Sequence, residues 1–159
     1  MTFDSVWVHI DNELLKMQKA LYENQRFLAA VENYQQDSVL YDGLIGSLAM
    51  NLQSFYTGAE RICLKIARDI DDSVARGERW HKTLLEQMAI ETDQRPVVLE
   101  SDTFTQLEQL RGFRHFVRNA YSYTLEAERV LLLAETLTTC YESLERNYLI
   151  FKQLLQKQV

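Results

Sequence analysis

A single proline and five glycines in 159 residues leave this chain few points at which a helix has to stop. The one β-like piece is Pro96–Leu99, so signals for strands are nearly absent. Apolar residues instead recur at gaps of three and four over long stretches, which is the period of one face of a helix. The sequence therefore predicts an all-α fold. Its length suits one domain, residues 1–159, with a sizeable core.

Breaks in the apolar pattern divide the chain into four long helices and one short one. The polar segment 35–38 offers N-cap residues between the first two helices. We expect an up-and-down bundle of the long helices, with the short third helix across one end. The first expected helix runs from a cap at Asp4 or Ser5 to about Tyr34, and the second follows the apolar stripe Leu44–Ile66 and ends within Asp69–Gly77. The short third helix covers Trp80–Met88. The fourth runs from a cap at Asp102 or Thr103 through Tyr121 or Tyr123, and the last covers roughly Glu126–Gln156.

Charge and composition exclude several classes of protein. The net charge of −6 argues against a general affinity for nucleic acid or anionic membranes, so any such contact must be local. No apolar run approaches the ~20 residues that cross a bilayer. The start of the chain lacks a basic region followed by an apolar stretch, so we expect a cytoplasmic location. Cys63 and Cys140 are far apart in helical apolar patterns and are interpreted as buried free thiols.

The segment 110–121 is the exception to the acidic character of the chain, since it holds three arginines and a histidine without an acid. At ~100° per residue, one narrow arc of a helix carries the residues Arg111, Arg114, Arg118 and Tyr121. The adjoining arc is apolar and can face a core: Leu110, Phe113, Val117 and Ala120. Guanidinium groups match the geometry of phosphate, so the cluster points to phosphate chemistry. The alternative is a solvated face whose arginines pair with acids such as Glu108 or Glu126.

Other candidate sites carry less chemistry. There is no glycine-rich phosphate loop, and no Glu-x-x-His motif that could hold a di-iron centre in a bundle. His9, His81 and His115 are scattered, so no metal site is predicted. Trp80 and His81 open the short helix, and we interpret the pair as packing residues that anchor it to the core.

At the arginine helix the sequence resembles a known family. The pattern Arg114-x4-Asn119-x-Tyr121 matches the Arg-x4-His-x-Tyr signature of HepT-like HEPN proteins except at one position. The resemblance extends to Trp80–Met88, to Arg95-Pro96-Val97 and to Phe113–Asn119, and it covers most of the chain from Leu44 to Leu133. It implies a helical bundle of the HEPN type.

The resemblance also implies a function. HepT-like toxins are metal-independent ribonucleases that need no cofactor and form homodimers through the signature helix. Their antitoxin is an MNT-type nucleotidyltransferase, which transfers AMP to the signature tyrosine, here Tyr121. By this resemblance Arg114 contacts the RNA phosphate, Arg111 and Arg118 support it, and His115 and Asn119 orient groups or transfer protons.

The departure from the signature is Asn119, whose amide cannot exchange a proton near neutral pH. Three explanations remain open: His115 supplies the acid–base function, the protein is a catalytically dead member, or an inactivating substitution was introduced. Two further classes of function compete with the ribonuclease. One is a non-enzymatic binding subunit for a nucleotidyltransferase, and the other is a bundle whose arginine cluster is only a charged surface.

Overall fold

The structure, a computed structural model, describes residues 3–119 and 126–158. Helices make up most of these residues, and no strand occurs among them; a single antiparallel bridge joins Thr92 to Arg95. The helices are α1 (Asp4–Asn33), α2 (Ser38–Asp69), α3 (Trp80–Met88), α4 (Ser101–Arg118), α5 (Ala127–Glu135) and α6 (Leu137–Gln158). The all-α prediction is confirmed for this part of the chain.

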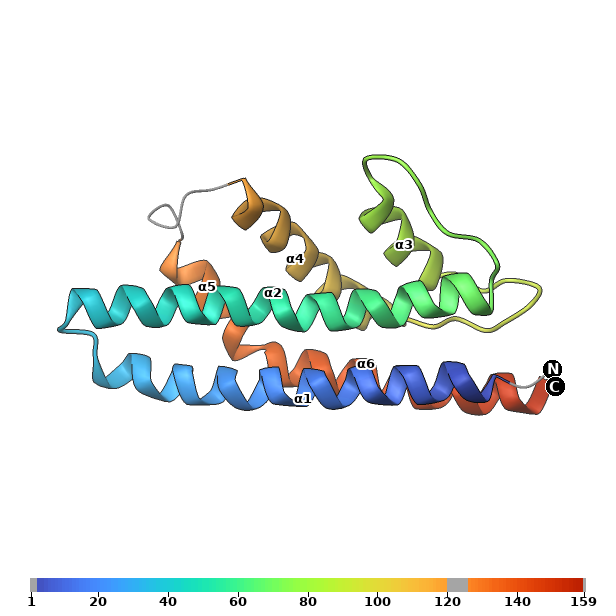
Figure 1. Cartoon of the computed structure of the whole chain (residues 1–159), viewed down its shortest axis with the longest axis horizontal. Helices are drawn as coiled ribbons and strands as arrows, with labels where there is room; N and C mark the ends of the chain where they lie inside the picture. Colours follow the sequence, from blue (N-terminus) through green and yellow to red (C-terminus); the bar gives the residue numbers. More distant parts are fainter. Residues whose placement is uncertain (1–2, 120–125, 159) are drawn as a thin grey trace.

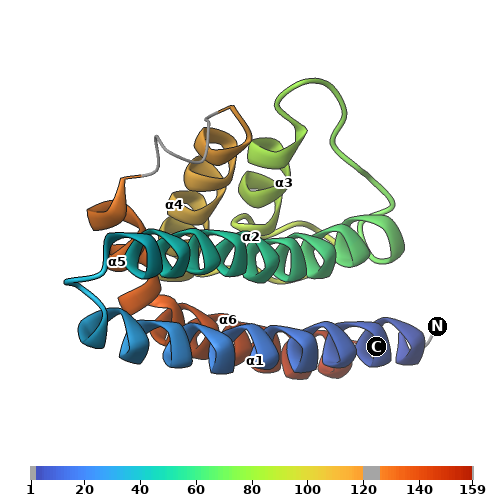
Figure 2. The same ribbon diagram turned by 60° about the vertical axis from the view of Figure 1, so that its left-hand side comes forward.

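The helices form a bundle in which α2 is the central element (Figure 1). The long helices α1 and α2 form an antiparallel hairpin, and α6 lies beside α1 on one side of α2 (Figure 2). Helices α3 and α4 lie on the other side of α2. The short helix was expected across one end of the bundle, whereas α3 packs against both α2 and α4. The two ends of the chain lie at the same end of the bundle.

The hairpin of α1 and α2 is specified by a cap and a close approach. Asp37 accepts hydrogen bonds from the backbone of Val39 and Leu40, both 3.1 Å long, which confirms the predicted N-cap segment. Further along α2, a Cβ on Gly58 would come within 2.5 Å of Cγ of Met17 on α1. The absence of a side chain at Gly58 thus allows the two helices to approach.

The prediction of one continuous last helix is wrong, because the chain breaks into α5 and α6 at Thr136. The backbone N–H of Thr136 donates to Leu133, three residues back, and its hydroxyl donates to the carbonyls of Leu132 and Leu133. This back-bonding by a threonine competes with the regular helical ladder. The described residues therefore hold six helices where five were expected.

The prediction for the end of the fourth helix is also wrong, because α4 ends at Arg118 and not at Tyr121 or Tyr123. The side-chain amide of Asn119 donates to the carbonyl of His115 at 2.9 Å, and the backbone N–H of Asn119 turns to Phe116. The side chain of Asn119 thus bonds to the carbonyl to which the backbone N–H of the same residue would donate if the helix continued. Residues 120–125 lie outside the described part of the chain.

The expected N-caps of two helices are replaced. Phe3, and not Asp4 or Ser5, occupies the cap position of α1 and makes no side-chain bond there. Glu100 occupies the cap position of α4, in place of Asp102 or Thr103. Its backbone N–H donates to Asn147 of α6 at 2.8 Å. Tertiary contact therefore fixes the start of α4 where a local cap was expected.

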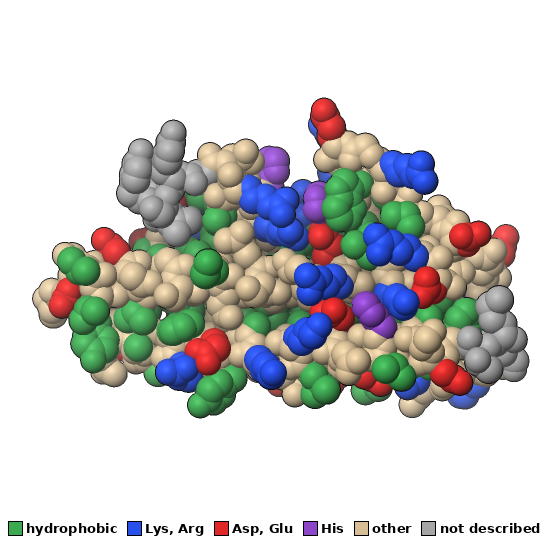
Figure 3. Space-filling model, viewed as in Figure 1, with side chains coloured by type: hydrophobic (Ala, Val, Ile, Leu, Met, Phe, Trp, Pro, Cys, Tyr) green, Lys and Arg blue, Asp and Glu red, His purple; other side chains and the backbone are tan. Residues whose placement is uncertain are grey.

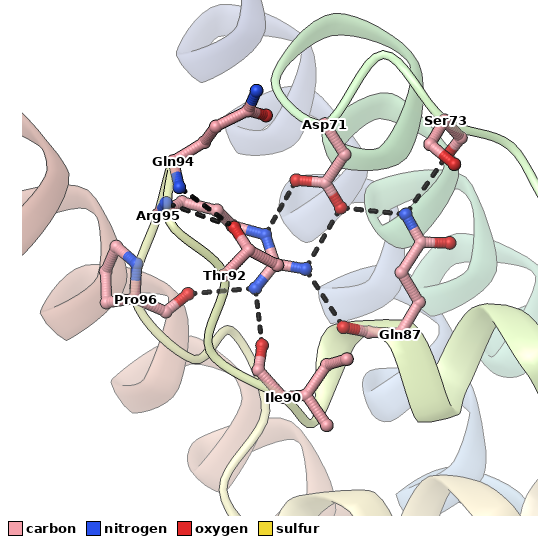
Figure 4. A network of polar contacts seen from close by, with 8 residues as sticks. All are labelled: Asp71, Ser73, Gln87, Ile90, Thr92, Gln94, Arg95 and Pro96. Atoms are coloured by element: carbon pink, nitrogen blue, oxygen red, sulfur yellow. Dashed lines mark hydrogen bonds and ion pairs between the residues drawn. The ribbon is translucent and has the colours of Figure 1, made fainter.

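A buried arginine anchors the loop between α3 and α4 (Figure 4). Arg95 is 1% exposed and pairs with Asp71 through two hydrogen bonds, of 2.7 and 3.0 Å. Its remaining donors reach the backbone carbonyls of Gln87, Ile90 and Pro96. All the hydrogen-bonding capacity of the guanidinium is thus used. The network ties the C-terminal end of α3 to the end of α2.

The core runs the length of the bundle and contains both cysteines as free thiols, as predicted. Burial raises the pKa of each thiol to about 12. Among the described residues, no helix combines the length and the apolar character needed to cross a membrane.

Candidate functional site

A pocket of about 630 Å³ opens where α3 and α4 stand side by side on α2. Figure 3 shows Lys, Arg and His side chains gathered around the notch between these two helices. The pocket is lined by one residue of α2, four from α3 and the segment before it, and five from α4 and its C-cap: Tyr56; Glu78, Arg79, His81 and Lys82; and Arg111, Arg114, His115, Arg118 and Asn119.

The pocket is cationic although the protein is acidic. Its lining holds five Lys and Arg side chains against one carboxylate, whereas the whole chain carries a net charge of −6. Such a local concentration of positive charge attracts polyanions and suits phosphate groups. The arginine cluster that the sequence singles out in an otherwise acidic chain thus has a defined position in the fold.

Helix α4 presents its two faces as the sequence predicts. Leu110 and Phe113 are buried in the core and Val117 is half-buried. On the adjoining face the side chains of Arg111 and Arg114 are 24% and 14% exposed, and Arg118 is exposed. The apolar face fixes the rotation of α4, and this rotation directs the arginines into the pocket.

The arginines of α4 have different partners. Arg111 pairs with Glu108 one turn earlier, as the charged-surface interpretation predicts, and this hydrogen bond raises the pKa of Arg111. Arg114 reaches across to α2, where its Nη1 lies 3.2 Å from Oε1 of the buried Glu60. Arg118 makes no ion pair with any described residue. One arginine is therefore held locally, one is held by a tertiary contact, and one is exposed.

Glu60, on α2, contacts two residues that line the pocket from different helices, Arg114 on α4 and His81 on α3. Its Oε1 accepts from Arg114, and its Oε2 lies 2.6 Å from Nδ1 of His81 on α3. The carboxylate is 9% exposed, so both contacts are shielded from bulk water and stronger than surface pairs.

Tyr56 lies beside this ion-pair network. The guanidinium of Arg114 stands 5.5 Å from the centre of its ring, in cation–π contact. Burial, and then the charge of Glu60, raises the pKa of the phenol well above its usual value of about 10. Its buried hydroxyl has no hydrogen-bond partner within the described residues. A ligand oxygen in the pocket could satisfy this donor.

The other predicted site residues lie at the rim. His115 is exposed and lines the pocket, and Asn119 lines it while its amide N–H₂ caps α4. Five of the six predicted residues therefore share one pocket. The sixth, Tyr121, lies outside the described residues.

The interpretation of Trp80 and His81 as packing residues holds for only one of them. Trp80 packs against the core, but His81 lines the pocket and contacts Glu60. Sequence reasoning also passed over Tyr56 and Glu60. The available signal was an acid, Glu60, set between the apolar residues Ala59 and Ile62 of the stripe along α2 and one turn after Tyr56.

The protein is thus a helical bundle with a cationic pocket, two of whose lining residues, His81 and Arg114, are joined by the buried Glu60. The chain belongs to the HepT-like family of HEPN proteins: the family profile described as "HepT-like protein" matches residues 47–155. The match includes every residue that lines the pocket. Comparisons with curated proteins and with solved structures gave no match.

Proposed function

We propose that this chain is a metal-independent endoribonuclease toxin of a toxin–antitoxin pair, acting on RNA in the cytoplasm. The observation that carries the proposal is the convergence of Arg111, Arg114, Arg118, His115 and Asn119 on one cationic pocket. Membership of the HepT-like family supports the same conclusion. The RNA phosphate would lie against Arg114 and Arg118, whose guanidinium groups stay charged at any working pH.

The chemistry of such a cleavage needs no metal. The ribose 2′-hydroxyl loses its proton and attacks phosphorus, the bond to the 5′-oxygen breaks, and that oxygen takes up a proton. The products are a 2′,3′-cyclic phosphate and a 5′-hydroxyl. Arg114 stabilises the negative charge that develops on the phosphate, and the imidazole of His115 transfers a proton. Asn119 contributes hydrogen bonds only.

Control by an antitoxin follows from the same site. An MNT-type nucleotidyltransferase would transfer AMP to Tyr121, two residues beyond Asn119 along the chain. The added phosphate would pair with Arg118 or Arg114 and compete with RNA for them. A homodimer through α4 would place two such pockets together.

The test is induced expression of the chain alone, with growth and total RNA integrity followed in parallel. We expect arrest and RNA loss, abolished by Arg118→Ala, which alters an exposed side chain and leaves the core intact. Arg26→Ala is the matched control, because Arg26 lies on the surface of α1, away from the pocket, where it pairs with Glu23 and contacts the ring of Tyr22. Normal growth and intact RNA would contradict the ribonuclease.

A second candidate is a binding subunit for a nucleotidyltransferase without ribonuclease activity. Asn119 favours it, because its side chain caps α4 and cannot transfer a proton. Asn119→His separates the two candidates in the same expression assay. Toxicity that appears only with histidine at this position would support the binding subunit, and toxicity of the parent chain would refute it.

A further inference from the structure

The proposed cleavage needs one group that takes a proton and one that gives a proton, but Asn119 can do neither and His115 can serve as only one of them. The structure offers a second such group elsewhere in the pocket. His81 lines the same pocket as the arginines, from a different helix. Its side chain is 26% exposed, so a substrate can reach it, while the Glu60 side chain behind it is 9% exposed. By contrast Arg95, the structural ion-pair residue of the next loop, has a side chain that is 0% exposed. His81 is therefore placed for contact with a ligand.

The contact with Glu60 fixes the tautomer of His81. An ionised carboxylate can only accept hydrogen bonds, so Nδ1 of His81 carries the hydrogen and donates it to Oε2 over 2.6 Å. In the neutral ring, Nε2 then holds a free lone pair. The carboxylate also stabilises the imidazolium that forms when Nε2 takes a proton, as in other carboxylate–histidine pairs that act as bases.

Two further contacts hold the pair in place. The ring of Trp80 stacks on that of His81, with centroids 3.6 Å apart and planes inclined by 30°. The other oxygen of Glu60 binds Nη1 of Arg114 at 3.2 Å. One carboxylate thus links the imidazole to the guanidinium that would hold the phosphate, and this sets the spacing between base and reacting phosphorus.

We propose that His81, oriented by Glu60, is the general base of the cleavage, an inference that rests on the proposed ribonuclease function. Nε2 of His81 takes the proton of the 2′-hydroxyl as the 2′-oxygen forms its bond to phosphorus. The bond from phosphorus to the 5′-oxygen breaks, and the 5′-oxygen takes a proton from the imidazolium of His115. The 2′,3′-cyclic phosphate and the 5′-hydroxyl leave, and the two histidines exchange protons with water to return to their starting states.

The first experiment measures cleavage of a synthetic RNA that contains the site mapped with the parent protein on total RNA. His81→Ala is expected to lower kcat/KM by about 100-fold or more, the usual contribution of a general base. Imidazole added to the solution should restore part of the rate, because it fits the space left by the side chain. His9→Ala, a histidine of α1 outside the pocket, is the matched control and should keep the parent rate.

The second experiment distinguishes base from acid. In the same RNA the bridging 5′-oxygen at the cleaved bond is replaced by sulfur, a leaving group that needs no protonation. His115→Ala should regain activity on this substrate, and His81→Ala should stay slow. Glu60→Gln, which keeps the size and an acceptor oxygen, should lower kcat with little change in KM, as expected of a positioning residue.

The outcomes distinguish a failure of the assignment of His81 as the base from a failure of the proposed ribonuclease function. If the parent chain cleaves RNA and His81→Ala cleaves it within threefold of the same rate, the base assignment is overturned and the ribonuclease stands. Recovery of His81→Ala on the sulfur substrate overturns it also, since His81 would then be the acid. A parent chain that cleaves no RNA overturns both.

Discussion

Removal of the buried cation Arg95 is expected to destabilise the fold more than any other single charge deletion described for this chain. In Arg95→Met the carboxylate of Asp71, whose side chain is 7% exposed, loses its two guanidinium hydrogen bonds. Three backbone carbonyls lose a donor as well. Loss of one partner from a buried ion pair costs about 3–5 kcal/mol, because the remaining charge stays desolvated.

Urea denaturation followed by far-UV circular dichroism measures this loss. With a slope of about 2 kcal/mol per molar urea, the midpoint should fall by about 2 M. Arg146→Met is the control, because Arg146 is exposed and lies 3.7 Å from an exposed Asp102, so less than about 1 kcal/mol should be lost. Combining Arg95→Met with Asp71→Asn should cost less than the sum of the single changes. Equal midpoints for Arg95→Met and Arg146→Met would refute the reasoning.

Three smaller predictions concern the core. Gly58→Ala gains about 1 kcal/mol of helix propensity, but its Cβ would lie 2.5 Å from Cγ of Met17, and overpacking costs about 1–3 kcal/mol. We therefore expect a lower midpoint in urea; a higher midpoint would show that α1 and α2 can move apart without cost. Cys63 and Cys140 should react with a thiol reagent at pH 8 only in denaturant, since both are buried and their pKa values are raised; prompt labelling of the native protein would contradict this. Above pH 9 the unfolded thiols lose protons that the folded ones keep up to a pKa of about 12, so each thiol should lower the free energy of unfolding by about 1 kcal/mol by pH 10. A Cys63→Ala variant should therefore lose about 1 kcal/mol less than the parent protein over this pH range.

The sequence by itself determined the helical class and much of the local detail. The apolar period of three and four, with few breakers, predicted α3 at its observed bounds of Trp80–Met88 and the cap segment before α2. It also predicted the two faces of α4, because the position of a side chain around a helix depends only on its spacing along the chain. Arg111, Arg114 and Arg118 could therefore be placed on one face before any tertiary structure was known.

The apolar periodicity did not predict where all of the helices begin and end. At Asn119 and Thr136, where α4 and α5 end, the backbone N–H bonds three residues back and the side chain bonds to a nearby carbonyl. Thr57 makes the same side-chain bond inside α2, where the helix continues. The same residue types also occur within helices, so the sequence pattern continued through both points. The start of α4 at Ser101 depends on Asn147, which lies far away in the chain.

Only the tertiary structure decided which residues form the Glu60–Arg114–His81 network. Glu60 and Arg114 are 54 positions apart, and Glu60 and His81 are 21 apart, on three different helices. Periodicity assigns each of these residues to a face of its own helix but does not say which faces meet. That depends on the packing of the bundle: the close approach at Gly58, the Asp71–Arg95 pair that holds α3, and the burial of the apolar face of α4.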